Sequence, residues 1–245
     1  MNTNIAFDGS RSLVASQFYV KTPDGAHVPR FGPAITISQQ TGSGAHDIAE
    51  RLAGMLQQSE PDHLAQWSVF DRQLVLKALE EHQWPARIER YMAEDRRSYV
   101  QDVMDELFGL RPPSWVLVPQ IAETIMRLVK TGHVILVGRG SVAVATDLPG
   151  VFHVRLVASL PKRINRIKSV FNFNAEDAVK YIRREDRGSR RYTQAHFHAN
   201  LDNDLLYHLV INTDRIPYSE AALLIAAEAR KAFARDGDSY DKIGD

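Results

Sequence analysis

The 245-residue chain contains no cysteine. That absence excludes disulfide bonds, thiolate nucleophiles and thiolate metal sites, and it fits a reducing compartment. An excess of charge is missing as well, because 30 basic residues balance 30 acidic ones. A balanced chain has no general attraction to nucleic acid or to an anionic membrane, although a local basic patch is compatible with it.

Long hydrophobic runs are equally scarce. The apolar stretches at 134–137 and 151–160 are short and interrupted, so no transmembrane helix is predicted. Residues 1–20 lack the basic start and the apolar block of a secretory signal. We therefore expect a cytoplasmic protein with no membrane partner.

The residues that are present predict one α/β domain. Hydrophobic residues make up 44% of the chain, which is enough for one core. Residues 1–33 show no sustained period and are expected to form an irregular arm, and residues 236–245 a polar tail. In between, residues 34–235 alternate short apolar strands with helical stretches, which predicts a parallel sheet flanked by helices. Strands are expected at 34–38, 67–70, 133–137, 151–157 and 207–212.

Helical stretches separate most of these strands. One ends near Gln58, and residues 73–130 are helical in character with a break at 111–114. Ser159 and Ser219 are predicted to cap two later helices, the second of which runs through Phe233. Residues 174–192 form a charged helical segment between them. Ligands of such sheets bind at the carboxyl ends of the strands, which here are Ser38, Asp71, Gly138-Arg139-Gly140, Ser159 and Asn212.

A glycine-rich turn, Gly42-Ser43-Gly44, joins the first strand to its helix. Such a turn points backbone N–H groups at one place, and the helix N-terminus adds a favourable field for an anion. Phosphate is the ligand that this arrangement predicts. The usual phosphate-binding loop also needs a lysine and a hydroxyl, but Ala45 and Asp47 stand in those positions. On these residues alone, a tight turn without a ligand explains the pattern equally well.

An ordered set of motifs resembles the cytidylate kinase-like family of bacterial P-loop proteins. The set comprises Ile-Thr-Ile-Ser at 35–38 with the Gly-Ser-Gly turn, Val-Phe-Asp-Arg at 69–72, Ile-Leu-Val-Gly-Arg-Gly at 135–140, Asp186-Arg187 with Arg190, and the segment 205–213. The resemblance covers roughly residues 34–233. Many members of this family also lack the loop lysine.

The resemblance implies a fold, an activity and cofactors. The fold is a P-loop NTPase-type α/β sheet with a helical insertion for a nucleoside monophosphate at about 73–130 and an arginine-rich lid at about 171–200. The activity is transfer of a phosphoryl group from ATP, with Mg²⁺, to a nucleoside monophosphate such as CMP or to a related small acceptor. Relatives that recognise cytidine have an aspartate after Gly-Arg. Gly140 stands in that position here, so cytidine specificity is unsupported at this position.

The resemblance also implies roles for individual residues. Donor phosphates would be held by Gly42, Ser43, Gly44, Ala45, His46 and Asp47, and the donor base by Asn212 and Thr213. The acceptor would be held by Asp71, Arg72 and Arg139, and the transferred group would be stabilised by Arg163, Arg187 and Arg190.

Each role has a plainer alternative. Asp71 can cap a helix, and Arg139 can be a surface residue in a turn. Asp47 can hold Mg²⁺ through water or simply complement the helix dipole. The arginines between 183 and 191 fall at helical spacings that place them along one side, which is typical of a phosphate-binding face, but the interleaved Glu185 and Asp186 also fit a solvated, salt-bridged helix.

Two other functions compete with the kinase hypothesis. A catalytically inactive, nucleotide-binding regulatory protein would explain both Ala45 and Gly140. An RNA-binding protein could use the arginines of 183–191, but the balanced charge and the interleaved acids argue against nucleic acid as a partner.

Overall fold

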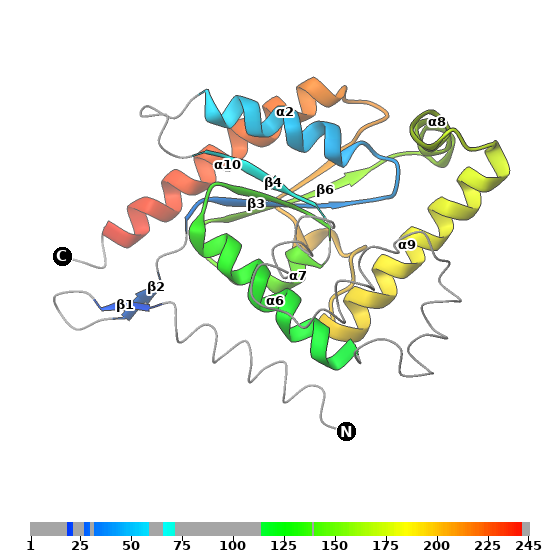
Figure 1. Ribbon diagram of the computed structural model, residues 1–245. Coiled ribbons are helices and arrows are strands. Elements are labelled where there is room, and N and C mark those ends of the chain that lie inside the picture. Colours follow the sequence, from blue (N-terminus) through cyan, green and yellow to red (C-terminus); the bar gives the residue numbers. More distant parts are fainter. Residues whose placement is uncertain are drawn as a thin grey trace.

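The computed structural model describes residues 19–21, 27–29, 32–58, 66–71, 114–138 and 140–241. Its centre is a five-stranded parallel sheet in the order β4-β5-β3-β6-β7 (Figure 1). The predicted α/β class with a parallel sheet is therefore confirmed. The strands are β3 (Ala34–Gln39), β4 (Ser68–Phe70), β5 (Val134–Val137), β6 (Val151–Val157) and β7 (Leu209–Asn212).

Helices cover both faces of the sheet (Figure 1). One face packs against α2 (Ala45–Gln57) and α10 (Tyr218–Asp241), and the shared core there includes Ile37, Leu52 and Ile225. The other face packs against α6 (Ser114–Thr131) and α7 (Ser141–Val144). None of the helices in the described part of the chain is long and apolar enough to cross a membrane.

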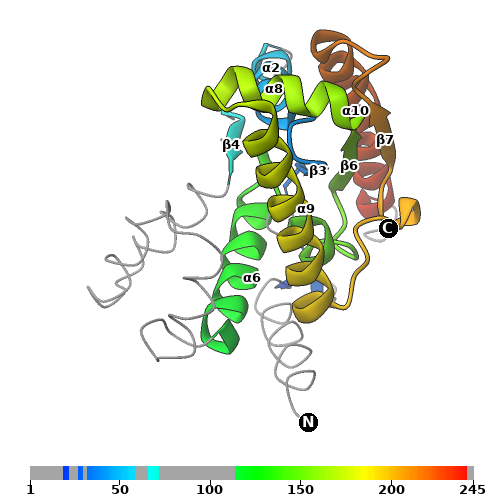
Figure 2. The ribbon, with the colours of Figure 1, turned by 90° about the vertical axis from the view of Figure 1, so that its right-hand side faces the viewer.

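Two further helices cross the carboxyl edge of the sheet. They are α8 (Leu160–Phe171) and α9 (Ala175–Phe197), and the short 3₁₀ turn η1 (Asp204–Leu206) follows. Figure 2 shows α8 lying across the end of α2, with α9 running from there past the strand ends towards α6. The side chain of Asn174 accepts a hydrogen bond from Asp177 N and so caps α9. The edge where ligands bind in such sheets is thus covered by α9.

Several local expectations differ from the structure. Ser159 stands at the N-cap of α8, but its side chain makes no capping hydrogen bond. Ser219 lies inside α10, which begins at Tyr218, and the helix continues to Asp241 through most of the expected polar tail. Within the segment expected to be irregular, β1 (Tyr19–Lys21) pairs antiparallel with β2 (His27–Pro29). These strands have three residues each, which is too short for a period to be visible in the sequence.

Candidate phosphate-binding site

The glycine-rich turn follows β3 directly and leads into α2. Gly42 and Gly44 both have left-handed backbones, with φ of 87° and 93°. A Cβ on Gly44 would lie 2.3 Å from Cζ of Tyr218, and one on Gly42 would lie 2.9 Å from the carbonyl oxygen of Arg163. Glycine is therefore required at both positions, by conformation and by the close approach of α8 and α10.

Ser43 and Thr213 hold this turn from inside. Ser43 is fully buried, and its N–H donates to the Gln40 carbonyl at 3.0 Å. The Thr213 hydroxyl, which is also buried, donates to the Ser43 carbonyl at 3.0 Å. Neither side chain is exposed to a nucleotide. The Thr213 hydroxyl, which was expected to contact a donor base, binds the turn in this structure, because Thr213 lies directly after β7 and packs against the turn.

The other predicted donor-binding residues face in different directions. Ala45 is buried in the core under α2. His46 is exposed, and its ring lies 3.5 Å from Glu50 on the same helix. Asp47 forms an ion pair with Arg166 of α8. Asn212 is exposed, and its side-chain oxygen accepts a hydrogen bond from Asp214 N at 2.9 Å.

A carboxylate from α9 lies on the turn. Asp186 Oδ1 accepts a hydrogen bond from Thr41 N at 2.8 Å, and Oδ2 accepts one from Arg163 Nη1 at 2.7 Å. Both side chains are largely buried, with 13% of Asp186 and 11% of Arg163 exposed. Arg163 Nη1 also reaches the Thr41 carbonyl at 3.3 Å. A backbone N–H of the turn and a guanidinium thus converge on one oxyanion, which is the arrangement that binds phosphate.

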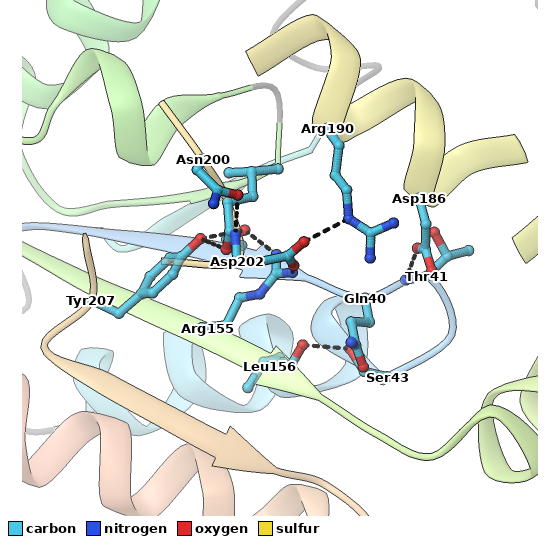
Figure 3. A network of polar contacts seen from close by, with 12 residues as sticks. Gln40, Thr41, Ser43, Arg155, Leu156, Asp186, Arg190, Asn200, Asp202 and Tyr207 are labelled. Carbon is cyan, nitrogen blue, oxygen red and sulfur yellow. Dashed lines mark hydrogen bonds and ion pairs between the residues drawn. The ribbon is translucent and has the colours of Figure 1, made fainter. Parts of the chain in front are cut away.

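The face of α9 that meets the sheet edge carries one arginine of the predicted group, Arg190, together with the acid Asp186. Asp186 and Arg190 point towards the turn and the strand ends (Figure 3). Ile182 and Phe197 are buried, and they fix which side of the helix packs inward. The remaining arginines of the predicted group are exposed: Arg183, Arg184, Arg187 and Arg191.

A second polar network lies beside the turn, and Figure 3 shows its members. Arg155, in the middle of β6, is 4% exposed and donates to Ser38 Oγ at 2.7 Å and to Asp202 Oδ1 at 3.1 Å. Arg190 donates to the other oxygen of Asp202 at 2.8 Å. Tyr207 donates to the Leu201 carbonyl at 2.8 Å, and burial raises the pKa of its hydroxyl.

The sequence reasoning missed Arg155, Asp186, Asp202 and Tyr207. One signal was available for Arg155, since a charged residue stands in a buried strand, Val151–Val157, whose other residues apart from His153 are apolar. Asp202 has no such signal, and the motif that contains Asp186 does not reveal its partners, because each contact joins residues far apart in the chain.

Among the predicted acceptor residues, Asp71 follows β4 directly and is half-buried. Arg72 and Arg139 lie outside the described residues. Gly140 has φ of 69°, and a Cβ there would lie 2.7 Å from Cε2 of Phe197. The end of α9 therefore packs against Gly140 and leaves no space there for a side chain.

The chain is similar to other proteins of known structure. A crystal structure of an uncharacterized protein from Eubacterium ventriosum is 13% identical, with a TM-score of 0.59, over 81% of this chain and 98% of that one. A gluconokinase from Sinorhizobium meliloti is 16% identical, with a TM-score of 0.42, over 87% of this chain and 98% of that one.

A curated relative gives a shorter match. The uronate isomerase of Corynebacterium glutamicum is 30% identical over 113 residues, which are 46% of this chain. The match covers only 22% of that protein's length.

The strongest comparison is with a family. Residues 34–215 match the cytidylate kinase-like family, and this range contains the turn, both polar networks and all five strands of the large sheet. The predicted α/β fold, a parallel sheet flanked by helices, lies within this range. Because the match spans most of the 245 residues, the chain belongs to the cytidylate kinase-like family.

Proposed function

We propose that the protein transfers a phosphoryl group from ATP to a small acceptor such as a nucleoside monophosphate. The observation that carries the proposal is the Asp186 carboxylate, held at once by Thr41 N and by Arg163. A carboxylate bound there stands in for a phosphate oxygen. Family membership supports a kinase-type reaction and leaves the acceptor open.

The donor would bind after Asp186 leaves the turn. The ATP phosphates would then accept hydrogen bonds from Thr41 N and from the N-terminus of α2. Arg163 would turn its guanidinium from Asp186 to the phosphate that moves, where it would supply positive charge in place of the missing loop lysine. Arg187, which is exposed on α9, would reach the same group only as α9 closes over the bound nucleotide.

The reaction itself is an in-line displacement. An oxygen of the acceptor forms a bond to the γ-phosphorus, the bond from that phosphorus to the β–γ bridging oxygen breaks, and ADP leaves. Asp71 would orient the acceptor from the end of β4, as would Arg72 and Arg139.

Magnesium accompanies ATP in such reactions and neutralises phosphate charge. Asp47 is a hard oxygen donor at the start of α2, which suits this ion. In the described part of the chain no three potential metal ligands come together. Asp47 therefore fits a role through water, which agrees with the tendency of Mg²⁺ to keep several of its waters.

Two observations favour the alternative of an inactive nucleotide-binding regulator. Ala45 is buried where a lysine would reach the phosphates, and Phe197 fills the space beside Gly140. The two functions differ in turnover rather than in nucleotide binding.

Purified protein with ATP, Mg²⁺ and a panel of nucleoside monophosphates separates them. The kinase proposal expects ADP to form with at least one acceptor, at a rate above that with ATP alone. ATP binding by calorimetry without turnover over the whole panel would overturn it in favour of the regulator. The Arg163→Gln variant serves as the control for contaminating kinases, since it should lose the activity.

A further inference from the structure

The Arg155 network places a buried positive charge at the ligand-binding edge of the sheet. Ser38 and Arg155 are directly paired in the register of β3 and β6. Their side chains lie on the sheet face opposite Ile37 and Leu156, which belong to the core under α2. Leu156, the next residue, accepts a hydrogen bond from Gln40 N of the phosphate turn at 3.0 Å. The buried guanidinium and the turn are therefore immediate neighbours (Figure 3).

A guanidinium buried to this degree requires a compensating anion. The anion here is Asp202, which comes from the loop before η1 and has 47% of its side chain exposed, against 5% for Arg155. The cation is thus fixed in the sheet, whereas the anion lies at the surface and can leave without disturbing the core.

A second cation meets the same carboxylate. Arg190 of α9 holds Oδ2 of Asp202 while Arg155 holds Oδ1. One carboxylate is therefore shared by two guanidiniums. Arg190 is four residues from Asp186, so these two residues lie about one helical turn apart, or roughly 6 Å along α9. That spacing suits a donor phosphate and an acceptor phosphate side by side.

We propose that Ser38, Arg155 and Arg190 form the subsite for the phosphate of the acceptor, a phosphomonoester, and that Asp202 occupies it in the absence of the acceptor. A phosphomonoester carries up to two negative charges and would balance both guanidiniums. Its oxygens can also take the bidentate hydrogen bonds that arginine offers. This inference rests on the proposed function, because it assigns the anion to the acceptor rather than to ATP.

Calorimetry on the Asp202→Asn variant tests the proposal, with inorganic phosphate and CMP as probes and cytidine as the probe without phosphate. The substitution removes the competing charge but keeps the shape. We expect phosphate and CMP to bind about tenfold tighter than to the wild type, which corresponds to losing one charge-assisted competitor. Cytidine should show no such gain.

The matched control is Asp204→Asn. Asp204 is an exposed acid two residues along the same loop, and in the described part of the chain it has no hydrogen bond or ion pair to Arg155 or Arg190. The Asp204→Asn variant should bind inorganic phosphate and CMP as the wild type does. Equal affinities in Asp202→Asn and the wild type would overturn the proposal and reduce the network to a structural tie between η1 and the sheet.

If the Asp202→Asn protein is less stable than the wild type, thermal unfolding gives a second measurement of phosphate binding. Its Arg155 lacks a charged partner, so added phosphate should raise the melting temperature of the variant more than that of the wild type. The Arg155→Lys variant keeps a positive charge but loses the planar fork, and it should bind phosphate about tenfold more weakly while ADP affinity stays unchanged. An equal rise in both proteins, or unchanged phosphate binding in Arg155→Lys, would contradict the subsite.

The same titrations with saturating ADP and Mg²⁺ distinguish acceptor from donor. If phosphate still binds when ADP is saturating, the subsite belongs to the acceptor. If ADP abolishes phosphate binding, the subsite belongs to the donor and the inference is overturned. If no variant turns over ATP while the gain in Asp202→Asn persists, the kinase proposal fails and the phosphate subsite stands.

Discussion

Asp186 of α9 and Arg163 of α8 form an ion pair over the phosphate turn, with 2.7 Å between Oδ2 and Nη1. The same carboxylate binds Thr41 N. Two helices are thus joined at the place where the donor phosphates are expected, and nucleotide binding must break this contact.

Replacing Asp186 with asparagine should therefore strengthen ATP binding. The amide oxygen can still accept from Thr41 N, but the charge that competes with phosphate is gone, and an affinity gain of about tenfold is expected. Calorimetry with ATP and Mg²⁺ measures it. Glu185→Gln is the matched control, because that carboxylate lies next in the chain and pairs with Arg184. A weaker affinity in Asp186→Asn would show that the carboxylate assists the nucleotide rather than competing with it.

The second prediction concerns Gly140 and Phe197. Gly140→Ala places a Cβ 2.7 Å from the Phe197 ring on a backbone with φ of 69°. Strain and overpacking together should lower the free energy of unfolding by about 2 kcal/mol. Denaturant titration gives the value.

Gly188→Ala is the control for this prediction. Gly188 lies within α9, and a Cβ there meets nothing within 4 Å. This substitution should stabilise the protein by about 0.5–1 kcal/mol, since alanine favours a helix more than glycine does. Equal effects at both positions would contradict the packing described for Gly140.

The third prediction is a pH dependence of stability centred on His153. Burial, and secondly the nearby His208, lower the pKa of His153 from its usual 6.5 to about 4, while Asp147 acts in the opposite direction. The ring also contacts the Thr36 hydroxyl, with 2.7 Å between Nδ1 and Oγ1.

The sign follows from proton uptake. Below pH 6.5 the unfolded chain protonates this imidazole, whereas the folded chain does so only near pH 4. The free energy of unfolding should therefore fall as the pH drops from 6.5 to 4, by up to about 3 kcal/mol. His153→Gln should flatten this part of the profile, and His46→Gln, which removes an exposed histidine, should not. An unchanged slope in His153→Gln would refute the assignment.

The fourth prediction addresses the lid. Arg187→Ala should lower turnover more than it weakens ATP binding, because the guanidinium is expected to act on the transferred group only after closure. Steady-state kinetics and ATP calorimetry on one preparation give both quantities. Arg183→Ala removes an exposed arginine one turn earlier and serves as the comparison. Equal losses of turnover and binding in Arg187→Ala would count against a transition-state role.

The sequence predicted the sheet well because its strands are local apolar runs. β3, β5 and β6 lie within one residue of the expected ranges, and α2 ends one residue before the expected Gln58. These signals depend only on neighbours in the chain. The glycine turn was equally visible, since the need for glycine is a property of the backbone itself.

The side of α9 that faces the site was not predictable in the same way. The spacing grouped five arginines on one side of the helix: Arg183, Arg184, Arg187, Arg190 and Arg191. Helix packing is decided by the buried Ile182 and Phe197, and of these arginines Arg190 contacts Asp202 at the site. The inward face then carries an acid, Asp186, which the sequence analysis treated as part of a solvated surface. The role of Asp186 depends on its contacts with Thr41 and Arg163, which lie far from it along the chain.

A crystal structure with a non-hydrolysable ATP analogue and Mg²⁺ tests the central claim most directly. The account predicts that Asp186 leaves Thr41 N, that a phosphate oxygen takes its place within hydrogen-bond distance, and that Arg163 turns to that phosphate. A nucleotide bound elsewhere, with Asp186 still on Thr41 N and Arg163, would contradict it.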